Sequence, residues 1–109
     1  MSQSPIFVKT EAFMKWLLEH TAKYPKHERF RLAKRIDDAL FDFHSLLTLA
    51  VYNPHESDWL KQADVRLQLL RTYLRLAVEL RYTDPQQFHY AAEHLDELGK
   101  LLGGWLKKA

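Results

Sequence analysis

The sequence contains no cysteine, which excludes disulfide bonds, thiolate metal ligands and thiol nucleophiles. A chain of 109 residues without such crosslinks often gains stability by oligomerisation. Three glycines and four prolines leave few turns, so the segments between them must be long, which favours helices. The absence of cysteine agrees with a cytoplasmic location, and the length predicts a single domain over residues 1–109.

Long apolar runs and a strong net charge are also missing. No stretch approaches the roughly 20 apolar residues of a membrane span, and the first residues lack the pattern of a secretory signal. We therefore expect a soluble protein without a membrane partner. The formal net charge is only +2, so attraction to an acidic partner must come from local clusters of cations.

The prolines divide the chain at nearly even intervals, and a helical pattern follows each of them, as is typical of proline in the first turn of a helix. They are Pro5, Pro25, Pro54 and Pro85. The pattern predicts helices over residues 6–22, 26–52, 54–82 and 85–106. Short connections between long helices make neighbours antiparallel, which predicts an all-α, up-down-up-down four-helix bundle.

Two helix starts carry the spacing of a capping box, in which a side chain at the cap and one three residues later satisfy backbone amides. One pair is Asn53 with Glu56, and the other is Asp84 with Gln87. Tyr24 precedes a proline and is biased away from helical torsions, so the first helix should end before it.

Apolar residues at helical spacing predict the core-facing stripes. On the second helix the stripe contains Leu32, Ile36, Ala39, Leu40, Phe43, Leu46, Leu47 and Ala50. On the fourth helix it contains Phe88, Ala91, Ala92, Leu95, Leu98, Leu102 and Leu106.

The third helix differs because its apolar residues form two arcs. The first arc contains Leu60, Ala63, Leu67, Leu70, Leu74 and Ala77, and the second arc contains Val65, Leu69, Tyr73, Leu76 and Leu80. A bundle helix needs one buried stripe, so the second arc predicts an oligomer interface. The alternative, equally favoured by the pattern, is that this helix is the most central one of the bundle.

Basic residues gather where the second helix is predicted to begin. Between residues 23 and 35, six cations accompany one acid, Glu28. The cations are Lys23, Lys26, Arg29, Arg31, Lys34 and Arg35. A helix start disfavours each cation by roughly 0.3 to 1 kcal/mol, so stability alone does not explain the cluster. Unpaired amides together with Arg and Lys side chains attract phosphate, which predicts a contact with nucleic acid.

An equally favoured alternative is a solvated face with salt bridges, because Lys34 and Arg35 lie within reach of Asp38. We predict a second basic spot at Arg71 and Arg75, one turn apart on the third helix. In a ring of subunits each cluster would be repeated, and together they would form a larger positive field.

Signatures of enzymes are not found. The sequence lacks a glycine-rich phosphate loop, a nucleophile turn, a His-Glu-x-x-His zinc motif and the paired Glu-x-x-His motifs of di-metal bundles. His89 and Glu93 lie on the polar side of the fourth helix and are interpreted as solvated surface. We expect a protein without enzymatic activity, metal, cofactor or small-molecule substrate.

Five aromatic residues are predicted to be packing or interface anchors, with base stacking as the less favoured alternative: Trp16, Trp59, Trp105, Phe30 and Phe41.

Two segments resemble a known family. They are YPKHERFRLAKRIDDALFDFHSLLTLA, from Tyr24 to Ala50, and LDELGKLLGGWLK, from Leu95 to Lys107. Both are similar to the accessory variability determinant (Avd) of diversity-generating retroelements, within a wider group of four-helix proteins related to those encoded by 23S rRNA intervening sequences. The intervening-sequence branch usually carries Ser-x-x-x-Asn-Ile-Ala-Glu-Gly on its second helix. This chain reads DDALFDFHSLLTLA there, which favours the Avd branch.

The resemblance implies a homopentameric barrel with a basic exterior. It implies binding to a reverse transcriptase and its template RNA in support of mutagenic cDNA synthesis, with no active site in the accessory protein itself. Its partners would be the polymerase, RNA or DNA, and further copies of the chain. The basic residues of the matching segment are Lys26, Arg29, Arg31, Lys34 and Arg35, and the terminal motif places Gly103 and Gly104 where a close turn or helix contact is expected. The alternatives are a bundle of the intervening-sequence type, a structural oligomer without a nucleic-acid role and, more remotely, a metal-binding bundle.

Overall fold

The structure is a computed structural model that describes residues 4–108, so residues 1–3 and 109 of the predicted domain lie outside the described residues. Within that range the chain forms four α-helices, one 3-10 turn and no strand. The elements are α1 (Pro5–Thr21), η1 (Lys26–Glu28), α2 (Leu32–Tyr52), α3 (Asp58–Glu79) and α4 (Pro85–Lys108). The prediction of an all-α protein built as a helical bundle is confirmed.

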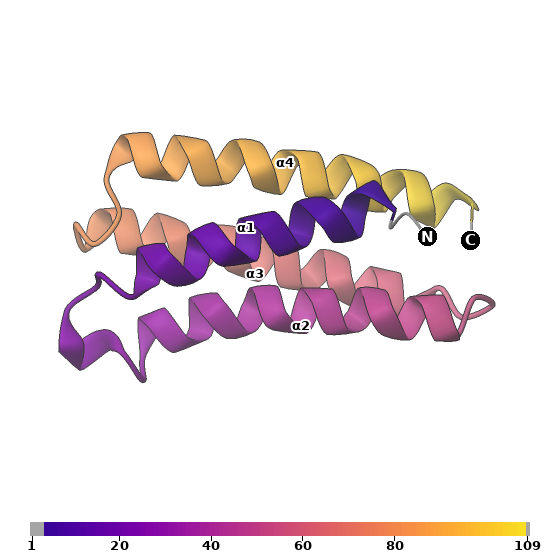
Figure 1. Cartoon of the computed structure of the whole chain (residues 1–109), viewed down its shortest axis with the longest axis horizontal. Coiled ribbons are helices and arrows are strands. Elements are labelled where there is room, and N and C mark those ends of the chain that lie inside the picture. Colours follow the sequence, from indigo (N-terminus) through magenta and orange to yellow (C-terminus); the bar gives the residue numbers. More distant parts are fainter. Residues whose placement is uncertain (1–3, 109) are drawn as a thin grey trace.

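The four long helices lie side by side in a body measuring 42 × 25 × 24 Å (Figure 1). Helix α2 packs against α1 and α3, and α4 packs against the same two helices. Figure 1 places both chain ends at one end of the bundle, while the α1–α2 and α3–α4 connections lie at the other. In the described part of the chain, no helix is long and apolar enough to cross a membrane.

The core contains the stripes that the sequence predicts. All eight stripe residues of α2 and all six of the first arc of α3 are buried. On α4, Ala91, Leu95, Leu98 and Leu102 are buried, whereas Phe88, Ala92 and Leu106 are partly exposed. The largest fully buried side chains are Phe13, Leu17, Ile36, Leu40, Phe43, Leu47, Leu60, Leu67, Leu70, Leu74, Leu95 and Leu98.

The second arc of α3 is not covered by the protomer. Val65 is 54% exposed, Leu76 44% and Leu80 45%, while Leu69 and Tyr73 are partly buried. The alternative that α3 is the most central helix is therefore wrong, because a central helix would have both arcs covered. An apolar surface remains along α3, and an interface at these residues stays a prediction.

The second helix begins later than predicted. Pro25 precedes the short turn η1 instead of a helix, and α2 starts only at Leu32. No Ser, Thr, Asn or Asp is present between residues 26 and 31 to cap an earlier start, and the cations there oppose the helix dipole. Most of the basic cluster therefore lies on a loop.

The third helix is also shorter than predicted. Asn53 does not cap it, because its side-chain amide donates to the Leu49 carbonyl at the end of α2, and Glu56 accepts instead from the Trp59 indole. At the other end, Arg81 adopts the left-handed conformation with φ 66°, and the Tyr82 amide donates to the Ala77 carbonyl at 2.9 Å. This hydrogen bond closes the helix in the manner of a Schellman motif.

The capping box at the start of α4 is confirmed. The Gln87 amide donates to Asp84 Oδ1 at 2.7 Å, and the Asp84 amide donates to Gln87 Oε1 at 2.9 Å. The two side chains thus satisfy two amides that the first turn of a helix leaves without intrahelical partners.

Candidate nucleic-acid interface

The loop that carries the basic residues is anchored to the bundle at two points. The first anchor is Thr83, a buried residue of the α3–α4 connection. Its hydroxyl lies 2.6 Å from the Tyr24 hydroxyl and 2.7 Å from His20 Nε2. Burial and the nearby Lys23 lower the pKa of His20, and burial raises the pKa of Tyr24. Both shifts favour the neutral forms, and the two side chains connect the two loops at this end of the bundle.

Glu28 forms the second anchor. It is 2% exposed, and its Oε2 accepts a hydrogen bond from the Tyr82 hydroxyl at 2.8 Å. That hydrogen bond is the main cause of the lowered pKa of Glu28, with smaller contributions from the Leu32 amide and Arg31. Arg31 Nε lies 3.3 Å from Glu28 Oε1. The only acid of the cluster is thus turned inward, while its cations remain outside.

Four of the six cations have no ion-pair partner among residues 4–108. Arg31 is paired with Glu28, and Lys34 is paired with Asp38 at 2.5 Å, as the alternative interpretation expected for Lys34. The cations without a partner are Lys23, Lys26, Arg29 and Arg35, all of them exposed. Their charges remain available to a ligand.

An exposed aromatic ring lies beside one of these charges. Phe30 is 81% exposed, and it lines a depression with Arg31, Lys34, Arg35 and Asp38. Phe30 does not pack against the core of the protomer, because the loop directs the ring into solvent, and a role as an interface anchor or in base stacking stays a prediction. Phe41 is 43% exposed, whereas Trp16, Trp59 and Trp105 pack against the core as predicted.

A second depression, with a volume of about 420 Å³, lies beside the loop and includes Lys26 and Arg29 in its lining. Asp37 lies in the same lining and accepts a hydrogen bond from the Thr21 hydroxyl at 2.8 Å. Burial raises the pKa of Asp37 to about 6, although the Thr21 hydrogen bond opposes this rise. The carboxyl group is therefore only weakly acidic, and it begins to lose its charge near neutral pH.

The structure separates the two residues of the predicted second basic spot. Arg71 pairs with Asp96 of α4 at 2.8 Å and is mostly buried, whereas Arg75 is exposed and donates to the Thr72 hydroxyl at 3.2 Å. Since Arg71 holds α3 against α4, only Arg75 presents its charge fully to solvent. A contact of either residue with nucleic acid stays a prediction.

Comparison with protein families identifies the relatives of this chain. The model of the bAvd-like family matches residues 6–109, which is nearly the whole sequence. The chain belongs to the bAvd-like family. No curated protein was found to be similar to it. The match confirms the resemblance that the two sequence segments indicated.

In this bAvd-like chain, the two glycines of the terminal motif make no close turn or helix contact within the protomer, and a contact with another subunit stays a prediction. Gly103 and Gly104 lie inside α4, and a Cβ atom added to either would meet no neighbouring atom within 4 Å. Neither a close turn nor a close helix contact requires them within the protomer. Each costs roughly 0.5 to 1 kcal/mol of helix stability relative to alanine, and the protomer alone offers no compensation.

His89 and Glu93 form an exposed pair at 2.6 Å on α4, and in the described range no three histidine or carboxylate side chains are grouped as a metal site would need. No sequence pattern indicated the roles of Tyr82 and Thr83, which hold the basic loop from more than 50 positions away along the chain. Thr83 is a buried polar residue, and its burial would have been the signal for its role. The burial of a loop residue cannot be predicted from its immediate neighbours in the sequence.

Proposed function

We propose that this chain is a non-enzymatic accessory subunit of a diversity-generating retroelement. It holds template RNA on the loop between α1 and α2, binds the element's reverse transcriptase, and thereby supports mutagenic cDNA synthesis. Membership of the bAvd-like family supports the general role. The observation that carries the nucleic-acid part is the anchored loop, which presents the exposed Phe30 and three cations without ion-pair partners among residues 4–108, with Arg35 of α2 in the same depression as the ring.

The geometry of this loop favours single-stranded nucleic acid. Lys26, Arg29 and Arg35 contact the phosphates, and Phe30 stacks on an unpaired base. Stacking of a base on an aromatic side chain contributes about 1 to 3 kcal/mol, and it tolerates any sequence. A duplex would leave Phe30 without a base to stack on, so the loop would bind it through the phosphate contacts alone.

The test compares two double variants with the same change in net charge. Lys26→Glu with Arg29→Glu should weaken retention of single-stranded template RNA at least about tenfold and lower the slope of log affinity against log salt by about 1.4. Lys15→Glu with Lys61→Glu, at exposed positions of α1 and α3, should have a much smaller effect. Equal losses for the two variants would mean that the loop is not the binding site.

We further propose that the protomer is an antiparallel up-down-up-down bundle and that five copies form a ring. The position of both chain ends at one end of the bundle in Figure 1 supports the first part. The uncovered arc of α3 supports assembly, because three exposed apolar residues on one stripe need a partner surface. The number five comes from the family resemblance.

Light scattering tests the assembly. Leu76→Asp introduces a charge into the arc and should reduce the mass of the native particle, whereas Gln68→Asp, on the polar side of the same helix, should leave it unchanged. If the wild-type chain is a monomer at micromolar concentration, the ring proposal fails.

A further inference from the structure

The depression that contains Asp37 lies where α1 ends and α2 begins, beside the basic loop (Figure 1). Its volume of about 420 Å³ is within the range of known ligand pockets. We call it the α1–α2 pocket. Its lining combines one acid and two cations with apolar side chains, among them Asp37, Lys26, Arg29, Leu18, Pro25 and Ala33.

The carboxyl group of Asp37 is fixed in place, but only one of its oxygen atoms has a hydrogen-bond partner among residues 4–108. Oδ1 accepts from the hydroxyl of Thr21, which is itself buried, at 2.8 Å. The carboxyl group also forms no ion pair within the described part of the chain. Oδ2 is therefore a positioned acceptor that a ligand can use.

The two cations of the pocket do not neutralise this acid. A cation close to Asp37 would lower its pKa, whereas burial raises that pKa to about 6. Lys26 and Arg29 must therefore lie some distance from the carboxyl group, and neither has an ion-pair partner of its own among the described residues. The pocket thus keeps positive and negative charge apart. A carboxyl group with a shifted pKa in a depression is typical of functional sites.

These features together define the ligand. It needs an anionic group for the cations, an N–H donor for Oδ2 of Asp37, and an apolar part between the two. An amino acid carries its opposite charges on one carbon atom, which does not match the separation of charges in the pocket. A nucleotide does match it, because the sugar separates the phosphate from the base. The amino groups of adenine, cytosine and guanine are donors, and a carboxylate that accepts from the amino group of cytosine is a known base contact.

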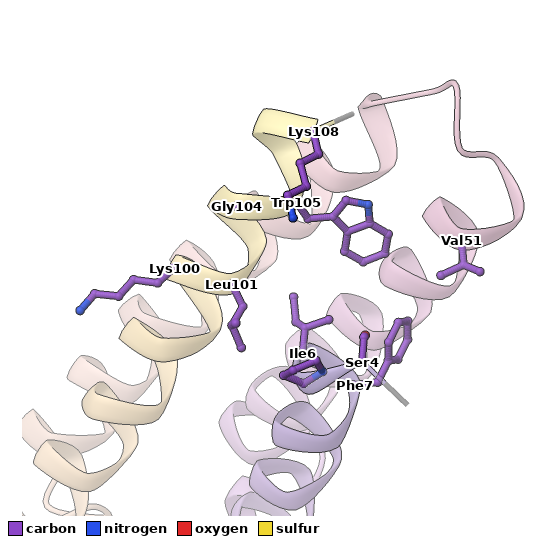
Figure 2. Close-up of a pocket in the computed structure, with 10 residues that line it drawn as sticks. Ser4, Ile6, Phe7, Val51, Lys100, Leu101, Gly104, Trp105 and Lys108 are labelled. Atoms are coloured by element: carbon purple, nitrogen blue, oxygen red, sulfur yellow. The ribbon is translucent and has the colours of Figure 1, made fainter. Parts of the chain in front are cut away.

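An apolar cleft of about 530 Å³ at the other end of the bundle offers no such set of groups. Phe7, Leu101 and Trp105 are among its lining residues, no acid belongs to the lining, and Lys100 points away from it (Figure 2). The combination of a positioned acceptor with separate cations is found in the α1–α2 pocket.

The position of the pocket also suits a single strand. Arg29 lines it, and the next residue, Phe30, lines the other depression of this region. One strand can therefore place one base at Phe30 and another in the pocket. In a duplex the amino groups of the bases are already paired, so a duplex could not donate to Asp37 in this way.

We propose that the α1–α2 pocket holds one nucleotide of a bound RNA strand and selects a base with an exocyclic amino group over uracil. Lys26 and Arg29 hold the phosphate, and Oδ2 of Asp37 accepts a hydrogen bond from the amino group. Uracil presents a carbonyl oxygen where cytosine presents its amino group, so the carboxylate repels it. This inference rests on the proposed function, which supplies RNA as the ligand.

The experiment measures the affinity of the full chain for two short RNAs of about eight nucleotides, one of cytosine only and one of uracil only. Fluorescence anisotropy at about pH 8 keeps Asp37 charged, because this pH lies above its pKa. The wild type should bind the cytosine RNA about tenfold more tightly. Asp37→Asn should abolish or reverse this preference, because the amide can still accept from Thr21 but presents an N–H group in place of Oδ2.

Asp42→Asn is the matched control. It removes the same charge from an exposed position of α2 that does not line the pocket. Loss of an acid strengthens the binding of both RNAs through charge alone, so the ratio of the two affinities is the quantity to compare. Asp42→Asn should leave this ratio within about twofold of the wild-type value.

The possible results separate this inference from the proposed function. If the wild type binds both RNAs but Asp37→Asn has the same affinity ratio, the pocket does not read the base, and RNA binding by the loop stands. A wild-type chain that binds neither RNA would refute the proposed function and this inference together. If free cytidine monophosphate binds as tightly as the cytosine RNA, the pocket serves a free nucleotide, and its assignment to an RNA strand is wrong.

Discussion

Replacement of Asp37 by asparagine should stabilise the protein at neutral pH. The side chain is half-buried, and burial raises its pKa from the ordinary 3.8 to about 6, so the folded state disfavours the charged form. At about 1.4 kcal/mol per tenfold change in a proton equilibrium, the full difference corresponds to about 3 kcal/mol at pH 7. Solvent around a partly exposed carboxyl screens this effect, and we expect about 1 to 2 kcal/mol. Asparagine carries no charge and retains an oxygen that accepts the Thr21 hydrogen bond.

The direction of the pH dependence follows from the raised pKa. In the wild type, the contribution of protonated Asp37 is fully present below about pH 4 and is lost as the pH rises through 6. Asp37→Asn should therefore gain little at pH 4 and most of its advantage above pH 7, where the melting temperature should rise by about 5 to 10 °C. Thermal unfolding at equal protomer concentration measures this, because assembly affects the apparent stability.

Asp38→Asn is the matched control. It removes the same charge at the adjacent position, but there it breaks the exposed pair with Lys34 and should not stabilise the protein. If Asp37→Asn had the same small effect at pH 4 and pH 7.5, burial of the Asp37 carboxyl would not be costing stability, and the reasoning would be wrong.

Three further substitutions test other parts of the structure. Thr83→Val keeps the shape of the side chain but leaves the Tyr24 hydroxyl and His20 without their buried partner. Thermal or denaturant unfolding should show that the free energy of unfolding falls by about 1 to 3 kcal/mol. An unchanged stability would mean that the network does not anchor the loop. Arg81→Gly relieves a left-handed backbone conformation and should raise stability by about 0.5 to 1 kcal/mol in the same assay, and a loss would contradict the assigned φ. Phe30→Leu should weaken binding of single-stranded RNA several-fold while duplex binding stays constant, because leucine is apolar but cannot stack. Equal effects on both kinds of RNA would mean that Phe30 does not act by stacking on an unpaired base.

Local patterns predicted most of the helices and the core. The stripes on α2 and on the first arc of α3 repeat every three to four residues, and a packed bundle leaves few other places for so many apolar side chains. The capping pair of Asp84 and Gln87 was predictable for a similar reason, since both hydrogen bonds lie within four residues.

Interactions between distant residues explain what the sequence did not reveal. In the turn at Lys26–Glu28, the Glu28 carboxylate accepts a hydrogen bond from the Tyr82 hydroxyl, 54 positions away along the chain. Without that partner, Glu28 would be expected to lie at the start of a helix. The Asn53 side chain could form a hydrogen bond at the end of α2 or cap the start of α3. Its spacing from Glu56 does not distinguish these two roles. The contact between the rings of Phe7 and Trp105 requires the first turn of α1 and the last turns of α4 to meet, which only the packed bundle determines.

The basic loop lies at one end of a rod 42 Å long, whereas α3, which carries the uncovered arc, runs along its length (Figure 1). If the chain binds RNA at the loop and assembles through the arc, as we propose, a variant impaired at the loop should still enter particles together with intact copies. A cell that produces both forms would then contain mixed particles with fewer intact loops, so a loop variant should interfere with the wild type in proportion to its share of the copies.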